Sequence, residues 1–235
     1  MSNDELWSKL AQLETDLHFA GTVSNRVFRT MFELFIDLQP RYTVETGSGR
    51  STLLFSNISK NHTVFTVDAG GSLSNTVSHP LYNKSTTTIV EGPTQLTMPR
   101  ANFKNNIDIA MIDGPHGFPF VSLEYYYLYP HLREGALLVL DDIHIPNIQF
   151  IYQFLKEDDM FNLVTVADNT AFFIRTSAET LDPLGDSWWL QKYNMARYAV
   201  PRRFYKRRLT MTMANRVKAL LPVGLKSFLK KLVRR

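Results

Sequence analysis

The feature of this sequence that most limits its fold is a series of short apolar runs, rich in β-branched residues, that alternate with polar or helical stretches. The runs are 42–46, 63–68, 86–90, 107–112, 136–141, 161–167 and 170–175. The first five are far enough apart for crossover helices, which parallel strands require. Only Asp168 and Asn169 separate the last two, as in a tight turn. The pattern predicts an α/β fold with a doubly wound, seven-stranded sheet, mostly parallel with a terminal antiparallel hairpin.

The remaining sequence predicts additional segments around this sheet. Residues 3–17 and 24–38 carry apolar side chains at helical spacing, and Pro40 closes the second stretch. The expected segments are an N-terminal helical cap at 1–40, a catalytic α/β domain at 41–176, a connector at 177–196 and a basic amphipathic tail at 197–235.

Charge is divided unevenly along the chain. The net charge is +4, yet residues 197–235 hold 13 of the 26 basic residues and none of the 22 acidic ones. From Leu225 to Val233, apolar residues fall on one helical arc and cations on the other. Such a segment suits an anionic membrane surface, or packs on the domain or on a second copy in a homo-oligomer, and these alternatives stay open. The scarcity of aromatic residues among the cations argues against nucleic acid as a partner.

Composition also restricts the class of protein. The chain has no cysteine, which excludes disulfides and thiolate metal sites. Its N-terminus is polar and acidic, and no window approaches the roughly 18 uncharged apolar residues of a membrane-spanning helix. We expect a cytoplasmic protein, and peripheral association with the inner face of a membrane remains open.

A glycine-rich turn follows the first predicted strand and opens an apolar helix. It reads Glu45-Thr46-Gly47-Ser48-Gly49-Arg50-Ser51-Thr52. Glycines allow a sharp turn close to a ligand, the helix N-terminus can bind a carboxylate, and an acidic side chain can hold an ammonium group. A zwitterionic amino acid suits both, although the motif alone also fits an ordinary βα turn. The candidate contacts are Glu45, Gly47, Ser48, Gly49 and Ser51.

Two further candidates follow the next predicted strands. Asp68 comes 23 residues after Glu45, the spacing at which α/β nucleotide folds place a carboxylate against ribose hydroxyls. A nicotinamide fingerprint needs a third glycine where Thr52 stands, so the pattern points away from that cofactor. Gly92 begins a turn suited to an adenine edge, although Pro93 removes one backbone donor.

With these motifs, residues 25–176 resemble the class I S-adenosylmethionine-dependent methyltransferases. VETGSGRST stands where their glycine-rich motif stands, and VDAGG stands at their ribose-binding acid. The resemblance implies a Rossmann-like sheet and S-adenosylmethionine as cofactor. IDIAMIDGPHGFP followed by LREGALLVLDDIH resembles the branch that contains metal-dependent sugar O-methyltransferases and cephalosporin-hydroxylase-like proteins.

This branch implies a divalent metal, most simply Mg²⁺. By resemblance, its ligands would be Asp113, Asp141 and Asp142, with Asp113 also at the cofactor and His116 as general base. The chemistry agrees, because a cation held by carboxylates stabilises a developing alkoxide and an imidazole can take its proton. A regular strand sends Asp141 and Asp142 to opposite faces, so both reach one ion only if the chain leaves the extended path near Asp142. If the chain stays extended, Asp142 caps the following segment or pairs with a basic residue. His144 is expected to be a loop residue without a direct role.

These features together predict an O-methyltransferase that acts on a hydroxyl of a saccharide or glycosylated metabolite with metal-assisted deprotonation. Phe118 is a candidate contact for that small-molecule or glycan acceptor. A nucleic-acid methyltransferase using the basic tail is one alternative, although Asp113-Gly114-Pro115-His116 replaces the Asp/Asn-Pro-Pro-aromatic motif of many such enzymes. A hydroxylase-like or a non-catalytic relative is the other.

Overall fold

The computed structural model describes residues 2–13, 23–103, 106–186, 188–198 and 213. They belong to two units, Met1–Pro183 and Leu184–Arg235, and each is described by itself. In the second unit, a short 3-10 turn, Trp188–Leu190, precedes helix α8, Lys192–Arg197. Most of the predicted basic tail lies outside the described residues, and so do the hypotheses that depend on it.

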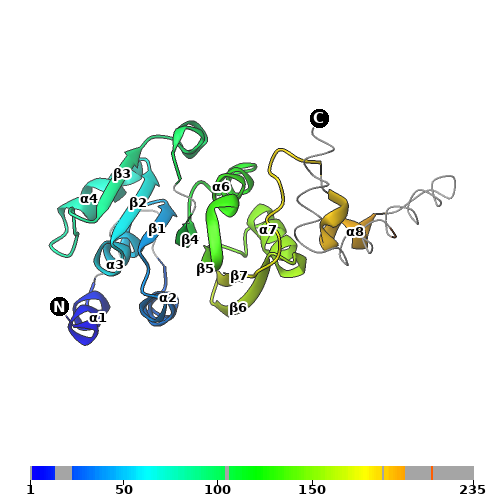
Figure 1. The fold of residues 1–235 in the computed structure, drawn as a ribbon. Helices are drawn as coiled ribbons and strands as arrows, with labels where there is room; N and C mark the ends of the chain where they lie inside the picture. The colour runs from blue at the N-terminus through cyan, green and yellow to red at the C-terminus, as the bar shows by residue number, and fades with distance from the viewer. Residues whose placement is uncertain (1, 14–22, 104–105, 187, 199–212, 214–235) are drawn as a thin grey trace. The chain divides into compact units, whose positions relative to one another are not determined.

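The first unit is built on a seven-stranded sheet in the order β3-β2-β1-β4-β5-β7-β6 (Figure 1). Strands β1 to β5 pair in parallel, whereas β7 runs antiparallel to both β5 and β6. The expected fold is confirmed, including the terminal hairpin. The strands are β1 Tyr42–Thr46, β2 Asn61–Thr66, β3 Thr87–Glu91, β4 Ile107–Ile112, β5 Leu132–Leu140, β6 Phe161–Ala167 and β7 Thr170–Arg175.

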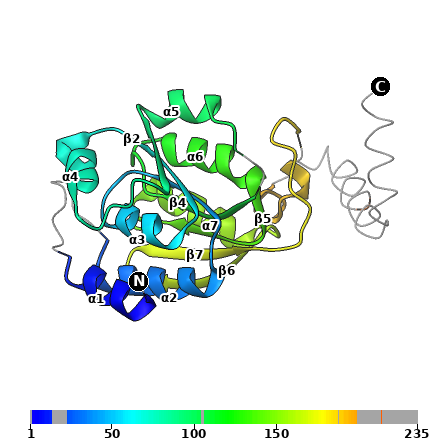
Figure 2. The same ribbon diagram turned by 60° about the vertical axis from the view of Figure 1, so that its left-hand side comes forward.

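Helices cover both faces of the sheet (Figure 2). Helices α1, α2 and α3 pack on one face, while α6 and α7 pack on the other. Every residue of the central strand β4 is buried, as expected for a strand covered on both sides. Met111 belongs to the hydrophobic core under α1, α2 and α3, and Ala110 belongs to the core under α6 and α7. The helices of this unit are α1 Asn3–Ala11, α2 Asn25–Leu38, α3 Arg50–Ile58, α4 Ser72–Ser78, α5 Thr94–Thr97, α6 Phe120–Leu128 and α7 Pro146–Glu157.

The N-terminal helices are part of this packing. Phe35 of α2 lies fully buried and stacks on Phe55 of α3, with 5.0 Å between the ring centroids. At the start of α2, Ser24 caps the helix by accepting a hydrogen bond from the Val27 amide, and its hydroxyl donates to Asp168 in the β6–β7 turn at 2.5 Å. The predicted helical cap therefore shares a hydrophobic core with the sheet.

Some strand ends differ from the sequence expectation in ways that matter for the site. β2 ends at Thr66 rather than at residue 68, so Asp68 lies in the loop beyond it. β5 begins earlier than expected, at Leu132, which pairs with Ile107 of β4 before an irregularity in the register, and β5 ends at Leu140. Asp141 therefore also follows its strand. Within the described part of the chain, no helix is long and apolar enough to cross a membrane.

Candidate functional site

The carboxyl ends of the five parallel strands lie at one edge of the sheet, where doubly wound folds bind their ligands. The predicted cofactor residues follow β1, β2 and β3, and the predicted acidic residues follow β4 and β5. Both predicted groups are therefore placed at the same edge by the topology.

Gly47 lies where the turn after β1 meets the end of β4. Its φ is +86°, and a Cβ built on it would lie 2.3 Å from the carbonyl oxygen of Asp113. Its amide donates a 2.9 Å hydrogen bond to the carbonyl of Phe65 in β2. A side chain is therefore excluded at this position both by backbone conformation and by the close approach of Asp113.

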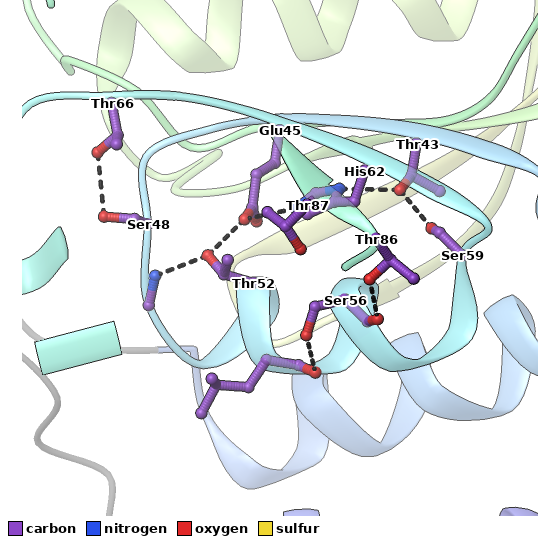
Figure 3. Close-up of polar contacts among 12 residues, drawn as sticks. Thr43, Glu45, Ser48, Thr52, Ser56, Ser59, His62, Thr66, Thr86 and Thr87 are labelled. Carbon is purple, nitrogen blue, oxygen red and sulfur yellow. Dashed lines mark hydrogen bonds and ion pairs between the residues drawn. The ribbon is translucent and has the colours of Figure 1, made fainter. Parts of the chain in front are cut away.

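The rest of the glycine-rich turn is held by hydroxyl groups (Figure 3). The Ser48 hydroxyl lies 3.0 Å from that of Thr66 at the end of β2. Gly49 is the N-cap residue of α3, and its amide donates to the Thr52 hydroxyl at 3.0 Å. Ser51 is buried in the first turn of the helix. The turn is thus ordered by contacts within the protein.

Glu45 of β1 belongs to a buried polar network that also contains Thr52 and His62 (Figure 3). One carboxylate oxygen accepts from the Thr52 hydroxyl and lies 3.0 Å from Nε2 of His62. Nδ1 of His62 lies 2.8 Å from the Thr43 hydroxyl. The side chain of Glu45 is 1% exposed, so the structure shows it joining β1, β2 and α3. Its predicted contact with an ammonium group stays a prediction.

Asp68 and Gly92 follow the neighbouring strands β2 and β3. The Asp68 carboxylate accepts hydrogen bonds from the Ser74 hydroxyl and from the amides of Ser74 and Leu73, at 3.3 and 3.0 Å for the amides. These bonds at the start of α4, those of Ser74 first, lower the pKa of Asp68. Gly92 has a φ of +135°, and its amide donates to the Thr66 carbonyl at 2.8 Å. Both residues are held at the edge where the cofactor is expected.

Asp113, His116 and Asp142 form a compact cluster at the ends of β4 and β5. Nε2 of His116 lies 3.0 Å from Oδ2 of Asp142 and 3.9 Å from Oδ1 of Asp113. One ligand atom from each residue lies within 4.8 Å of the others. Asp142 has a φ of +54°, so the chain does leave the extended path there. That turn brings the Asp142 carboxylate to His116.

The cluster has the electrostatics of a cation flanked by carboxylates. Hydrogen bonds to Asp113 and then to Asp142 raise the pKa of His116 to about 10. Desolvation raises the pKa of Asp113, whose side chain is 32% exposed. The His116 hydrogen bond lowers the pKa of Asp142. The two carboxylates therefore favour the imidazolium form of His116, and only Asp142 lies within hydrogen-bond distance of its Nε2.

Asp141 and His144 stand beside this cluster. Oδ1 of Asp141 accepts a hydrogen bond from the Thr170 hydroxyl of β7, and desolvation raises the pKa of Asp141. Nδ1 of His144 lies 3.6 Å from Oδ1 of Asp142. The structure thus brings Asp113, Asp142 and His116 together, holds Asp141 against β7, and places His144 next to Asp142, which the sequence did not indicate.

Glu124 of α6 is a residue that the sequence reasoning missed. It is 1% exposed and accepts 2.8 Å hydrogen bonds from the hydroxyls of Thr46 and Thr94. Burial raises the pKa of Glu124 to about 7. A single charged residue within a mainly apolar and aromatic helix, close in sequence to His116, was the available signal.

The close approach at Gly47 predicts a specific loss of stability. We expect Gly47→Ala to lower the free energy of unfolding by at least about 2 kcal/mol more than Gly135→Ala. Both glycines have positive φ, but a Cβ at Gly135 would meet only the flexible tip of Arg133, at 3.3 Å. Chemical denaturation of the two variants measures this difference. If both variants lost the same free energy of unfolding, the positive φ alone would explain why residue 47 is a glycine.

Burial of Glu124 predicts a pH dependence. Its folded-state pKa is raised from 4.5 to about 7, so the stability it contributes is present below pH 4.5 and is lost as the pH rises through about 7. Relative to Glu124→Gln, wild-type protein should therefore lose roughly 2 to 3 kcal/mol of unfolding free energy across that range. Denaturation in EDTA at a series of pH values measures the difference, and parallel curves would contradict it.

Comparison with known proteins gives one family-model match, in the central part of the chain. Residues 44–143 match the family model Methyltransf_24, a methyltransferase domain. None of the curated proteins compared with the sequence matches it.

Several solved structures are similar to this one. The O-methyltransferase TomG from Streptomyces achromogenes, in complex with SAM, is 16% identical with a TM-score of 0.58, over 74% of this chain and 91% of that chain. A putative O-methyltransferase from Klebsiella pneumoniae is 14% identical with a TM-score of 0.58, over 74% and 90%. An O-methyltransferase from Bacillus cereus, in complex with SAH, is 15% identical with a TM-score of 0.54, over 74% and 90%. At these identities the likeness shows the fold.

The matched segment contains the glycine-rich turn, the loops after β2 and β3, and the acidic cluster after β4 and β5. It spans strands β1 to β5 of the sheet. Residues 44–143 therefore match a methyltransferase domain, and they lie in a fold that is shared with solved methyltransferase structures.

Proposed function

We propose that the protein is an O-methyltransferase that transfers the methyl group of S-adenosylmethionine to a hydroxyl of a saccharide or glycosylated metabolite. The observation that carries this proposal is the cluster of Asp113, His116 and Asp142 immediately beside the glycine-rich turn. The backbones of Gly47 and Asp113 touch, so a methyl donor held by the turn would lie next to groups suited to a hydroxyl. Positioning two reactants side by side accounts for much of the catalysis of such transfers.

The cofactor would occupy the carboxyl edge above β1 to β3. We assign its carboxylate to the glycine-rich turn and the first turn of α3, because the amides there suit an anion. Asp68 is assigned to the ribose hydroxyls, since its exposed carboxylate has acceptor capacity beyond its bonds to Leu73 and Ser74. Gly92 is assigned to the adenine edge. When bound, the cofactor supplies a methyl group that is already activated for transfer.

The residues after β4 and β5 fit a divalent cation. Two carboxylates and one imidazole within 4.8 Å offer a suitable donor set, and Mg²⁺ favours the carboxylate oxygens. Asp141 is not one of these three residues; its Oδ1 accepts from Thr170, so its other carboxylate oxygen would have to reach the cation. A cation at this place would act as a Lewis acid toward an acceptor oxygen.

His116 is assigned the role of removing the acceptor proton. An imidazolium cannot accept a proton, so this role requires that the carboxylate charges that raise its pKa be neutralised. The imidazole is 46% exposed, and an acceptor can therefore reach it. Phe118 follows closely and is 80% exposed, which offers an apolar face on which a sugar ring can stack.

Calorimetric titration with S-adenosylmethionine tests the cofactor site. Wild-type protein should bind, and Asp68→Ala should weaken binding at least about tenfold because hydrogen bonds to a charged acceptor are lost. Ser74→Ala is the matched control, since it removes one hydrogen bond to Asp68 but leaves the carboxylate in place. Absence of binding by wild-type protein, or full binding by Asp68→Ala, would contradict the assignment.

Transfer of labelled methyl groups to a panel of saccharides and glycosides, with RNA for comparison, tests the reaction. We expect labelled saccharide in the presence of Mg²⁺, loss of the reaction in EDTA, and a rate reduction of roughly 100-fold or more for His116→Gln. His79→Gln, which lies beyond α4, should leave the rate unchanged. Labelling of RNA alone would favour a nucleic-acid methyltransferase instead.

A further inference from the structure

We infer that Glu124 is a positioning residue for the acceptor site, because its buried carboxylate holds the turn that carries Asp113 and His116. The inference rests on the proposed function for its catalytic meaning. Its structural content is independent, since it concerns only contacts among Glu124, Thr46, Thr94 and Gly114.

The first contact runs through the hydroxyl of Thr46. This hydroxyl donates to Oε2 of Glu124 at 2.8 Å and accepts from the amide of Asp113 at 3.0 Å. The Thr46 hydroxyl has only one hydrogen, and the Glu124 carboxylate accepts it. A lone pair of the same hydroxyl oxygen is therefore directed toward the Asp113 amide. Thr46 pairs with Ile112 in the last position of the β1–β4 ladder. The hydrogen bond from the Asp113 amide to the Thr46 hydroxyl therefore extends the contact between β1 and β4 by one residue beyond the ladder.

The second contact is direct. A Cβ built on Gly114 would lie 2.2 and 2.5 Å from the two carboxylate oxygens of Glu124. The carboxylate thus packs against the backbone immediately after Asp113, two residues before His116. Residue 114 must be glycine for this packing, since a methyl group would displace either the carboxylate or the turn.

A third contact fixes the carboxylate itself. The Thr94 hydroxyl at the start of α5 donates to Oε1 at 2.8 Å. Each oxygen of Glu124 therefore has its own donor, one from the residue that ends β1 and one from a helix that follows β3. This arrangement holds α6 at a defined distance from both elements, with the Asp113 turn between them.

A buried carboxyl group costs free energy unless its hydrogen bonds compensate, and an apolar residue would fill the same space without that cost. The helix around Glu124 is otherwise apolar and aromatic on its buried side, with Val121, Tyr125 and Leu128. A purely structural role is therefore served as well by a hydrophobic side chain. A carboxylate is required if the function is to orient the Thr46 hydroxyl toward Asp113.

Amide hydrogen exchange of the full chain tests this inference without cofactor or acceptor. In Glu124→Ala and in Thr46→Val, exchange in peptides spanning residues 113–118 should be about five- to tenfold faster, because a hydrogen bond of about 1 kcal/mol no longer restrains the turn. The matched control is Asp108→Asn. Asp108 is also a buried carboxylate, but it receives the amides of Arg41 and Tyr42 at the opposite end of β4. Asp108→Asn should lower the stability of the protein without making hydrogen exchange at residues 113–118 faster than elsewhere.

Affinity for Mn²⁺ alone, measured by electron paramagnetic resonance, gives a second readout. Glu124→Ala and Thr46→Val should weaken it by roughly tenfold or more, as is usual when partners that orient metal ligands are removed. Asp108→Asn should retain the wild-type value. Glu124→Gln, which keeps the volume and one acceptor, should fall between wild type and Glu124→Ala.

The outcomes separate this inference from the proposed function. If exchange at 113–118 is unchanged in both variants while their stability falls as in Asp108→Asn, Glu124 is a core residue only and the inference is wrong. If wild-type protein binds no Mn²⁺, the metal part of the proposed function fails, but hydrogen exchange still decides the role of Glu124. If Glu124→Ala does not fold, Thr46→Val carries the test, since valine has nearly the shape of threonine.

Discussion

The site depends on the contact between two loops that leave adjacent parallel strands. β1 and β4 pair side by side, and the turns beyond them meet where Gly47 touches the Asp113 carbonyl. The interval between the two turns leaves no room for even a methyl group. The expected cofactor region and the acidic cluster are thus neighbours as a consequence of strand pairing, and α/β folds concentrate their chemistry at such edges.

Two buried acids support this contact from opposite sides of the sheet. Glu45 joins β1 to His62 and to Thr52 of α3, on the face covered by the N-terminal helices. Glu124 joins the end of β1 to α5 and α6 on the other face. Buried polar groups that are fully hydrogen-bonded make a structure more rigid, whereas a missing partner is costly. The edge of the sheet is therefore held by directional bonds in addition to apolar packing.

The acidic cluster shows how a local backbone conformation can set the chemistry. Asp142 adopts a left-handed conformation, and this places its carboxylate 3.0 Å from His116 rather than on the far side of the strand end. The resulting pair of carboxylates raises the pKa of His116 well above its usual range. The negative charge of these two carboxylates therefore favours the protonated imidazole.

The sequence by itself determined the elements and their order. Alternating apolar runs, helical spacing and the two-residue turn at Asp168 and Asn169 are local patterns, and they predicted the seven strands and the terminal hairpin that the structure confirms. The same logic placed Gly47, Asp68, Asp113 and Asp142 at one edge of the sheet, because parallel strands have their carboxyl ends together, although β2 and β5 end one or two residues earlier than expected.

Only the tertiary structure decided how the side chains at those ends are used. Glu124 and Thr46 are 78 residues apart, and Glu45 and His62 are 17 apart, and no periodicity relates either pair. The hydrogen bond from Thr170 to Asp141 likewise depends on the pairing of β5 with β7, which brings together residues 29 apart. Hydrogen bonds act over about 3 Å and depend on direction, so their partners are fixed only when packing sets the positions of whole elements.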